Sequence, residues 1–184
     1  MIKINLKTPI SYYGGKQAML KHIMPLLPAH KTYVEPFCGG CAVFWAKEAV
    51  PAEILNDYNG MVVNFYQQLK TNFTALKVKI DATPYSREVY KSAMFVYSHP
   101  YIHSDVHKAW AFWVCCIQGF SNKIGSWRGS TTRHKEALLS FNKKEGFTID
   151  LALRLELTQI ECGDAVKLII SKDTPETLFY VDPP

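Results

Sequence analysis

The sequence has no long apolar run, and its start, MIKINLKTPI, lacks the apolar core of a signal peptide. The longest apolar stretch, residues 109–117, is far too short to cross a bilayer. Internal repeats and low-complexity segments are also missing, while 48% of residues are apolar and 13% aromatic. These features exclude a membrane-spanning or disordered chain and predict a soluble, intracellular globular protein without a membrane partner.

Cysteine is sparse, and its odd number excludes a scaffold built from short disulfide loops. We therefore expect reduced thiols in the cytoplasm. The five positions are Cys38, Cys41, Cys115, Cys116 and Cys162. The formal net charge of +5 is moderate, so it permits an acidic partner such as DNA without requiring one.

The order of predicted elements is typical of a parallel sheet. Residues 32–37 indicate a strand, the glycine pair Gly39-Gly40 a turn, residues 42–50 a helix, and residues 53–57 a second strand. Apolar spacing predicts a helix over residues 60–79, and strand patterns return at 159–164 and 178–181. We expect a doubly wound α/β sheet of about four strands, formed by residues 1–82 and 145–184. Residues 83–144 form a mainly helical insertion.

The glycine turn suggests a ligand site. A strand that opens through glycines into a helix lets the backbone approach a ligand closely. Asp57 follows the next strand, where an acidic residue in this fold hydrogen-bonds ribose hydroxyls. The full G-x-G-x-x-G spacing is absent, so a plain tight turn remains an alternative for Gly39-Gly40.

Two further motifs have simple structural alternatives. YYGGK at residues 12–16 is a second glycine turn, and Lys16 is also compatible with a solvated side chain. CGDA at residues 162–165 follows a strand, where Asp164 lies at the sheet edge or caps the next helix.

Taken together, YxGGK, VEPFxGGxAVF, ILNDxN and a terminal DPP resemble the Dam-type DNA adenine methyltransferases, which use S-adenosylmethionine. The resemblance extends from Tyr12 to Pro184 and implies a Rossmann-like sheet with a target-recognition insertion. It implies cofactor contacts at Tyr12, Lys16, Glu35, Phe37, Gly39, Gly40, Asp57 (ribose), Asp164 (adenine ring) and Asp182. It implies catalytic roles for Asp182, Pro183 and Pro184.

The implied chemistry explains the DPP motif. Adenine's exocyclic amine is a poor nucleophile because its lone pair is delocalised into the ring. The Asp182 carboxylate and the Pro183 carbonyl can each accept one amine hydrogen, and the rigid prolines hold both acceptors in place. Because the amine lies inside the stack of double-stranded DNA, the target adenine must be flipped out.

In the family, an aromatic residue follows the prolines and the sheet continues for three more strands, whereas this sequence ends at Pro184. We therefore expect a prokaryotic or phage enzyme cut at its catalytic motif. The 184-residue chain alone should be inactive, and its exposed last strand should promote self-association.

The insertion is expected to bind DNA. Residues 121–144 hold six basic side chains against one acid, Glu136, and Trp127 lies among them. The predicted contacts are Lys123, Trp127, Arg128, Arg133 and Lys135, and Lys143 and Lys144 complete the basic set. An ordinary solvated loop is the alternative. Gln118-Gly119 stands where better-known members carry Asn-Gly, so no recognition sequence is transferred.

Two other functions remain open. Cys38 and Cys41, between a strand and a helix, match a thioredoxin-like redox pair, which requires a lowered thiol pKa. A single CxxC does not provide zinc-ligand spacing. The chain is also compatible with a non-catalytic DNA-binding or cofactor-binding remnant.

Overall fold

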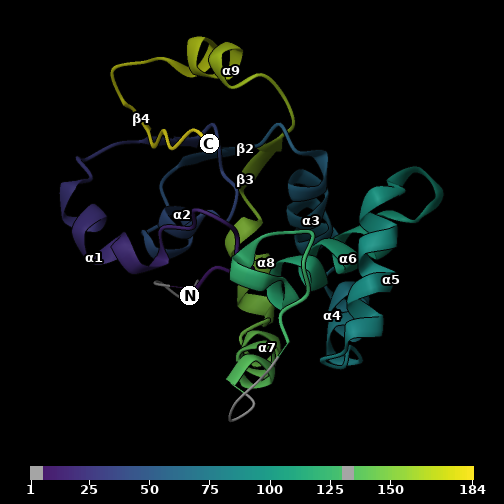
Figure 1. The fold of residues 1–184 in the computed structure, drawn as a ribbon. Helices are drawn as coiled ribbons and strands as arrows, with labels where there is room; N and C mark the ends of the chain where they lie inside the picture. Colours follow the sequence, from purple (N-terminus) through teal and green to yellow (C-terminus); the bar gives the residue numbers. More distant parts are fainter. Residues whose placement is uncertain (1–5, 130–134) are drawn as a thin grey trace.

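Four parallel strands form one sheet in the computed structural model, which describes residues 6–129 and 135–184. The strands are β1 (Thr32–Glu35), β2 (Ala52–Asn56), β3 (Thr158–Glu161) and β4 (Thr177–Phe179), in the order β3-β2-β1-β4. The chain runs outward from β1 to β3 and then returns to the other side of β1 as β4 (Figure 1). This reversal is a topological switch point, where open α/β sheets bind ligands. The expected α/β fold is confirmed, while self-association through the last strand stays a prediction.

The alternation of side chains along the strands divides the core between two faces. Val34 and Ile54 point to one face, where they pack with Leu168 of α9 (Ala165–Lys172). Tyr33 and Leu55 point to the other face and belong to the larger core. Figure 1 shows α9 on one side of the strands and α8 on the other.

The remaining helices mostly follow the strands or form the insertion. They are α1 (Leu20–Ile23), α2 (Ala42–Ala46), α3 (Gly60–Thr71), α4 (Phe73–Asp81), α5 (Arg87–Ser98), α6 (Asp105–Gln118), α7 (Lys135–Glu145) and α8 (Ile149–Leu155). Short 3-10 turns lie at Gln17–Met19, Met24–Leu26, Pro100–Ile102 and Phe120–Asn122. In the described ranges, no helix is long and apolar enough to span a bilayer.

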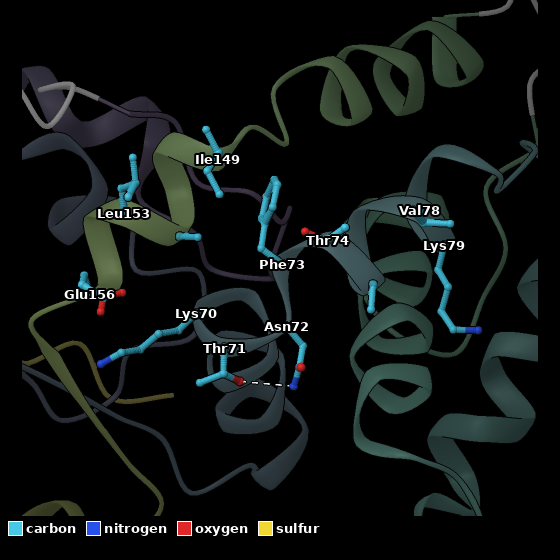
Figure 2. A pocket seen from close by; sticks show the side chains of 12 residues that line it. Lys70, Thr71, Asn72, Phe73, Thr74, Val78, Lys79, Ile149, Leu153 and Glu156 are labelled. Carbon is cyan, nitrogen blue, oxygen red and sulfur yellow. Dashed lines mark hydrogen bonds between the residues drawn. The ribbon is translucent and has the colours of Figure 1, made fainter.

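The prediction of a single helix over residues 60–79 is wrong, because the helix breaks at Asn72. Asn72 leaves the helical region (φ −131°, ψ 35°), and its side-chain amide donates to Gln68 Oε1 at 2.7 Å. A groove of about 820 Å³ opens between the break and α8 (Figure 2). Its lining includes Lys70, Phe73, Val78, Ile149, Leu153 and Glu156. None of the predicted site residues lines this groove.

The helix predicted over residues 42–50 is also shorter than expected, since it ends at Ala46. Lys47 is extended (φ −81°, ψ 160°), and its Nζ donates to Glu53 Oε1 of β2 at 2.6 Å. Arg154 of α8 pairs with the same carboxylate, and one of its distances is 2.9 Å. All three side chains are buried. One carboxylate thus compensates two buried cations and ties α2, β2 and α8 together.

The insertion and the sheet region share one hydrophobic core. Phe112 and Trp113 of α6 are fully buried, and the Phe112 ring lies 5.8 Å from Phe65 of α3. The same cluster contains Tyr33 and Leu55 of the sheet. Domain boundaries at residues 82 and 145 stay a prediction, but the two parts share buried side chains across them.

Candidate functional site

The glycine turn after β1 is held from three sides. Gly39 N donates to Asp57 Oδ2 at 2.9 Å, and Gly39 O accepts from Tyr66 Oη at 2.9 Å. On the third side, a Cβ at Gly39 would lie 3.0 Å from Cδ1 of the Tyr12 ring. Gly39 also has a φ of +45°, a left-handed conformation that favours glycine. The turn is therefore fixed at the switch point, and its role in ligand binding stays a prediction.

Asp57 lies directly after β2 and faces this turn. Its Oδ1 accepts from Asn59 N at 2.9 Å, while its Oδ2 holds Gly39 N. Each carboxylate oxygen has further acceptor capacity, and the residue is partly exposed. Asp57 can therefore support the turn and still accept hydrogen bonds from a ligand.

The YYGGK segment brings a cation to the same edge of the sheet. Gly15 N donates to Tyr12 O at 3.0 Å, which closes the turn, and Lys16 Nζ donates to Gly14 O at 2.9 Å. Lys16 Nζ also lies 2.5 Å from Asp182 Oδ2. Both side chains are about one-third exposed. This ion pair joins two motifs that lie at opposite ends of the sequence.

Asp182 reaches this position because β4 pairs with β1. Val34 lies opposite Phe179, and Tyr180 N donates to Val34 O at 2.9 Å, which continues the pairing beyond the strand. Asp182, Pro183 and Pro184 then follow at the carboxyl edge of the sheet. The predicted catalytic acid and the glycine turn therefore follow neighbouring strands on either side of the switch point.

Glu35 and Tyr12 support the site from the inside. Glu35 is buried at the end of β1, and its Oε1 accepts from Tyr33 Oη at 2.6 Å and Phe44 N at 2.8 Å. Burial raises the pKa of Glu35 to about 7, although both hydrogen bonds oppose the shift. Burial also raises the pKa of Tyr12 to about 12, against a hydrogen bond to the Asn59 side chain. In this structure Glu35 fastens the start of α2, and its cofactor contact stays a prediction.

The other predicted cofactor residues differ in position. Phe37 and Gly40 lie in the β1–α2 connection, and Gly40 O accepts from Thr8 Oγ1 at 2.6 Å. Asp164 caps α9, because its Oδ1 accepts from Lys167 N at 2.9 Å. The capping alternative is thus confirmed for Asp164, and a cofactor role there stays a prediction. Thr8 and Tyr66, which also hold the turn, have no sequence signal that separates them from ordinary core residues.

The predicted DNA-contacting residues lie on two neighbouring segments. Lys123 Nζ lies 4.4 Å from the centre of the Tyr13 ring, so the insertion meets the YYGGK segment. Arg128 Nε donates to Gly119 O at 3.1 Å, and Lys135 begins α7. Arg133 lies outside the described residues. The centre of the Trp127 ring lies 5.8 Å from that of Tyr85, and the Arg87 guanidinium lies over the Trp127 ring. Trp127 therefore packs against other side chains of the insertion.

The structure places three further residues of the insertion in contact with backbone carbonyls. Lys143 Nζ donates to Thr8 O at 2.6 Å and Lys144 Nζ donates to Asp81 O at 3.1 Å, so both lysines lie on α7 with backbone partners and not in an open loop. Gln118, at the position of the family's Asn-Gly motif, is fully buried and donates to Pro84 O at 3.0 Å. It therefore joins the end of α6 to the segment before α5.

The redox alternative lacks the thiol chemistry that it requires. Cys38 and Cys41 are both buried and free, and burial raises the pKa of each thiol above its usual value. A reactive redox cysteine needs a lowered thiol pKa and access to solvent. These two cysteines are structural parts of the turn.

Comparison with known proteins adds independent information. The model of the family described as "D12 class N6 adenine-specific DNA methyltransferase" matches residues 12–184. The chain is 40% identical over 72 residues to Type II methyltransferase M1.LlaDCHI of Lactococcus lactis subsp. cremoris, across 38% of this chain and 25% of that protein. It is 27% identical over 179 residues to the DNA N-6-adenine-methyltransferase of Escherichia phage P1, across 93% of this chain and 23% of that protein. Retron Ec67 DNA adenine methylase of Escherichia coli is 31% identical over 70 residues, across 38% of this chain and 24% of the methylase. The matched segments thus span about a quarter of each relative.

Proposed function

The chain belongs to the D12 class of N6 adenine-specific DNA methyltransferases, and from this membership we propose that its switch-point site binds S-adenosylmethionine beside a target adenine. The whole protein then methylates the N6 amine of that adenine in double-stranded DNA. The observation that carries this proposal is the Lys16–Asp182 ion pair, with its 2.5 Å distance, next to the Gly39 turn. This ion pair supports a single site formed by motifs that lie far apart in the sequence.

The residues around the turn fit the proposed cofactor. The Gly39 turn lies at the switch point, and Asp57 beside it offers carboxylate oxygens for ribose hydroxyls. The nearby Asn56 Oδ1 is a buried acceptor without a donor in the described residues. A buried acceptor without a partner is costly, so a ligand donor would stabilise it. When bound, S-adenosylmethionine supplies a methyl group on a sulfonium.

Asp182 and Pro183 prepare the adenine amine for that methyl group. The Asp182 carboxylate accepts a hydrogen bond from one N–H of the amine, and the Pro183 carbonyl accepts a hydrogen bond from the other. This concentrates the lone pair on N6, and the prolines fix both acceptors before the base arrives. The amine of a paired adenine lies within the stack, so the base enters the site flipped out of the duplex.

Lys16 has a separate positioning role. It pairs with Asp182 Oδ2 in the structure and also donates to Gly14 O at 2.9 Å. An adenine amine needs an oxygen of the same carboxylate, so Lys16 must share or release Asp182 when the base binds. Until then, the ammonium holds the carboxylate in position at the switch point.

The cofactor part of the proposal is tested by replacing Asp57 with alanine. We expect S-adenosylmethionine binding to weaken by about 1 to 3 kcal/mol, because the change removes a charged acceptor and frees Gly39 N. Calorimetry measures this difference directly. Asp81→Ala is the matched control, since Asp81 pairs with Lys77 on α4 and should leave affinity unchanged. Equal affinity for wild type and Asp57→Ala would remove Asp57 from the site.

A further inference from the structure

A second cavity lies where the segment before Tyr12, the end of α6 and α7 meet. It has a volume of about 300 Å³, and its lining is cationic. The lining residues are Ser11, Ile117, Arg128, Leu139 and Lys143, without an acidic residue among them. A cavity lined by two cations and a hydroxyl has the donors that an oxyanion requires.

Lys143 is the least compensated cation of this cavity. Its Nζ donates to Thr8 O at 2.6 Å and to Ile10 O at 3.4 Å, and no carboxylate of the described ranges pairs with it. Burial, reinforced by the charge of Lys7, lowers its pKa to about 8, against a weaker opposing effect of Cys116. An ammonium has three hydrogens, so two carbonyls leave one for another acceptor. An anion in the cavity would stabilise the charged form.

Arg128 is held at the same cavity by its surroundings. Its backbone N donates to Gln118 O at 2.9 Å, its Nε donates to Gly119 O at 3.1 Å, and its carbonyl accepts from Tyr85 Oη. Gly119 itself is required, because a Cβ there would lie 2.5 Å from both Cys115 O and Lys123 O. The backbone that carries the Arg128 side chain is therefore fixed at the cavity.

We propose that this cavity, formed by Ser11, Arg128 and Lys143, binds one phosphodiester group of the DNA substrate. The inference rests on the proposed function and adds a specific backbone contact to it. The location suits such a contact, because Thr8 bridges the two sites. Its carbonyl accepts from Lys143, while its Oγ1 donates to Gly40 O at 2.6 Å. A phosphate in the cavity would thus lie beside the segment that carries Tyr12, between the insertion and the sheet.

The test compares Lys143→Met with Lys144→Met. Both lysines lie on α7 and donate to backbone carbonyls, but only Lys143 lines the cavity. Duplex DNA binding is measured by fluorescence anisotropy over a salt series, after urea unfolding confirms that both variants are folded. Loss of one phosphate contact should flatten the slope of log affinity against log salt by about 1 in Lys143→Met. Lys144→Met should keep the wild-type slope.

Two results would overturn the proposal. They are a wild-type slope in Lys143→Met and an equal loss of slope in Lys144→Met. If Asp57→Ala leaves the cofactor affinity unchanged, the salt slopes of the lysine variants can still be interpreted. Each proposal can therefore fail without the other. If wild type binds no duplex DNA, both the DNA substrate and this contact are wrong.

If Lys143→Met does not fold, pH and Lys143→Arg provide the second measurement. Lys143 must be protonated to bind a phosphate, so wild-type affinity should fall as pH rises above about 8. Lys7 and Arg128 add positive charge around Lys143, and the thiol of Cys116 has a pKa raised well above its usual value, so it stays neutral in this range. Lys143→Arg keeps its charge and should lose the fall above pH 8. The same fall in both proteins would contradict the assignment.

Discussion

Replacing Glu53 by glutamine is expected to lower the free energy of unfolding by about 3 to 5 kcal/mol, because it leaves two buried cations without a counter-charge. Lys47 Nζ lies 2.6 Å from Glu53 Oε1, and Arg154 pairs with both carboxylate oxygens. The side chains of all three residues are at most 4% exposed. Glutamine keeps the volume of the side chain, so the change measures the charge more than the packing.

Urea unfolding measures this effect, and an exposed ion pair provides the matched control. Glu88 pairs with Lys91 at 2.9 Å on α5, where both side chains are more than 60% exposed. Glu88→Gln should change stability by less than about 1 kcal/mol, since water screens that pair. If Glu53→Gln cost no more than Glu88→Gln, the buried cluster would not hold α2, β2 and α8 together.

The largest effect on activity is expected at Asp182. In the complete gene product, Asp182→Asn should reduce methyl transfer to adenine by about 10²- to 10³-fold, the usual loss when one preorganised hydrogen-bonding group is removed from the reacting centre. An amide places N–H hydrogens where the substrate amine needs an acceptor, and it loses the ion pair with Lys16. Transfer of a labelled methyl group to duplex DNA measures the rate.

Asp173→Asn is the control for this variant, because Asp173 is an exposed acid in the connection before β4. It should retain the wild-type rate. If Asp182→Asn also retained that rate, the carboxylate would have no part in activating the amine, and the DPP motif would need another explanation.

The main parts of the site could be predicted because each one is written in a short local pattern. A β-branched strand, a glycine pair and a following strand define β1, the turn and β2 without knowledge of distant contacts. The turn and Asp57 follow neighbouring predicted strands, which placed them at one ligand site, while the resemblance to Dam-type methyltransferases implied that Asp182 joins them. The structure adds the partners, above all the Lys16 Nζ–Asp182 Oδ2 distance of 2.5 Å.

The parts that could not be predicted are a local break within a helix and contacts between distant segments. The apolar spacing from Val62 to Leu76 continues through Asn72, so the pattern hides a break that depends on Asn72's own backbone and side-chain bonds. Lys143 and Lys144 count as basic surface in the sequence, because their carbonyl partners lie 135 and 63 positions away, at Thr8 and Asp81. Charge counts along a chain do not reveal which cations are already bound.

The central claim is that the switch-point site methylates the N6 amine of adenine, and the most direct test is to identify the product. The complete gene product is incubated with isotopically labelled S-adenosylmethionine and duplex DNA, and the DNA is then hydrolysed to nucleosides for mass spectrometry. The account predicts label in N6-methyladenine, with none above background for Asp182→Asn. Label found only in a methylated cytosine, or no label in any nucleoside, would contradict it.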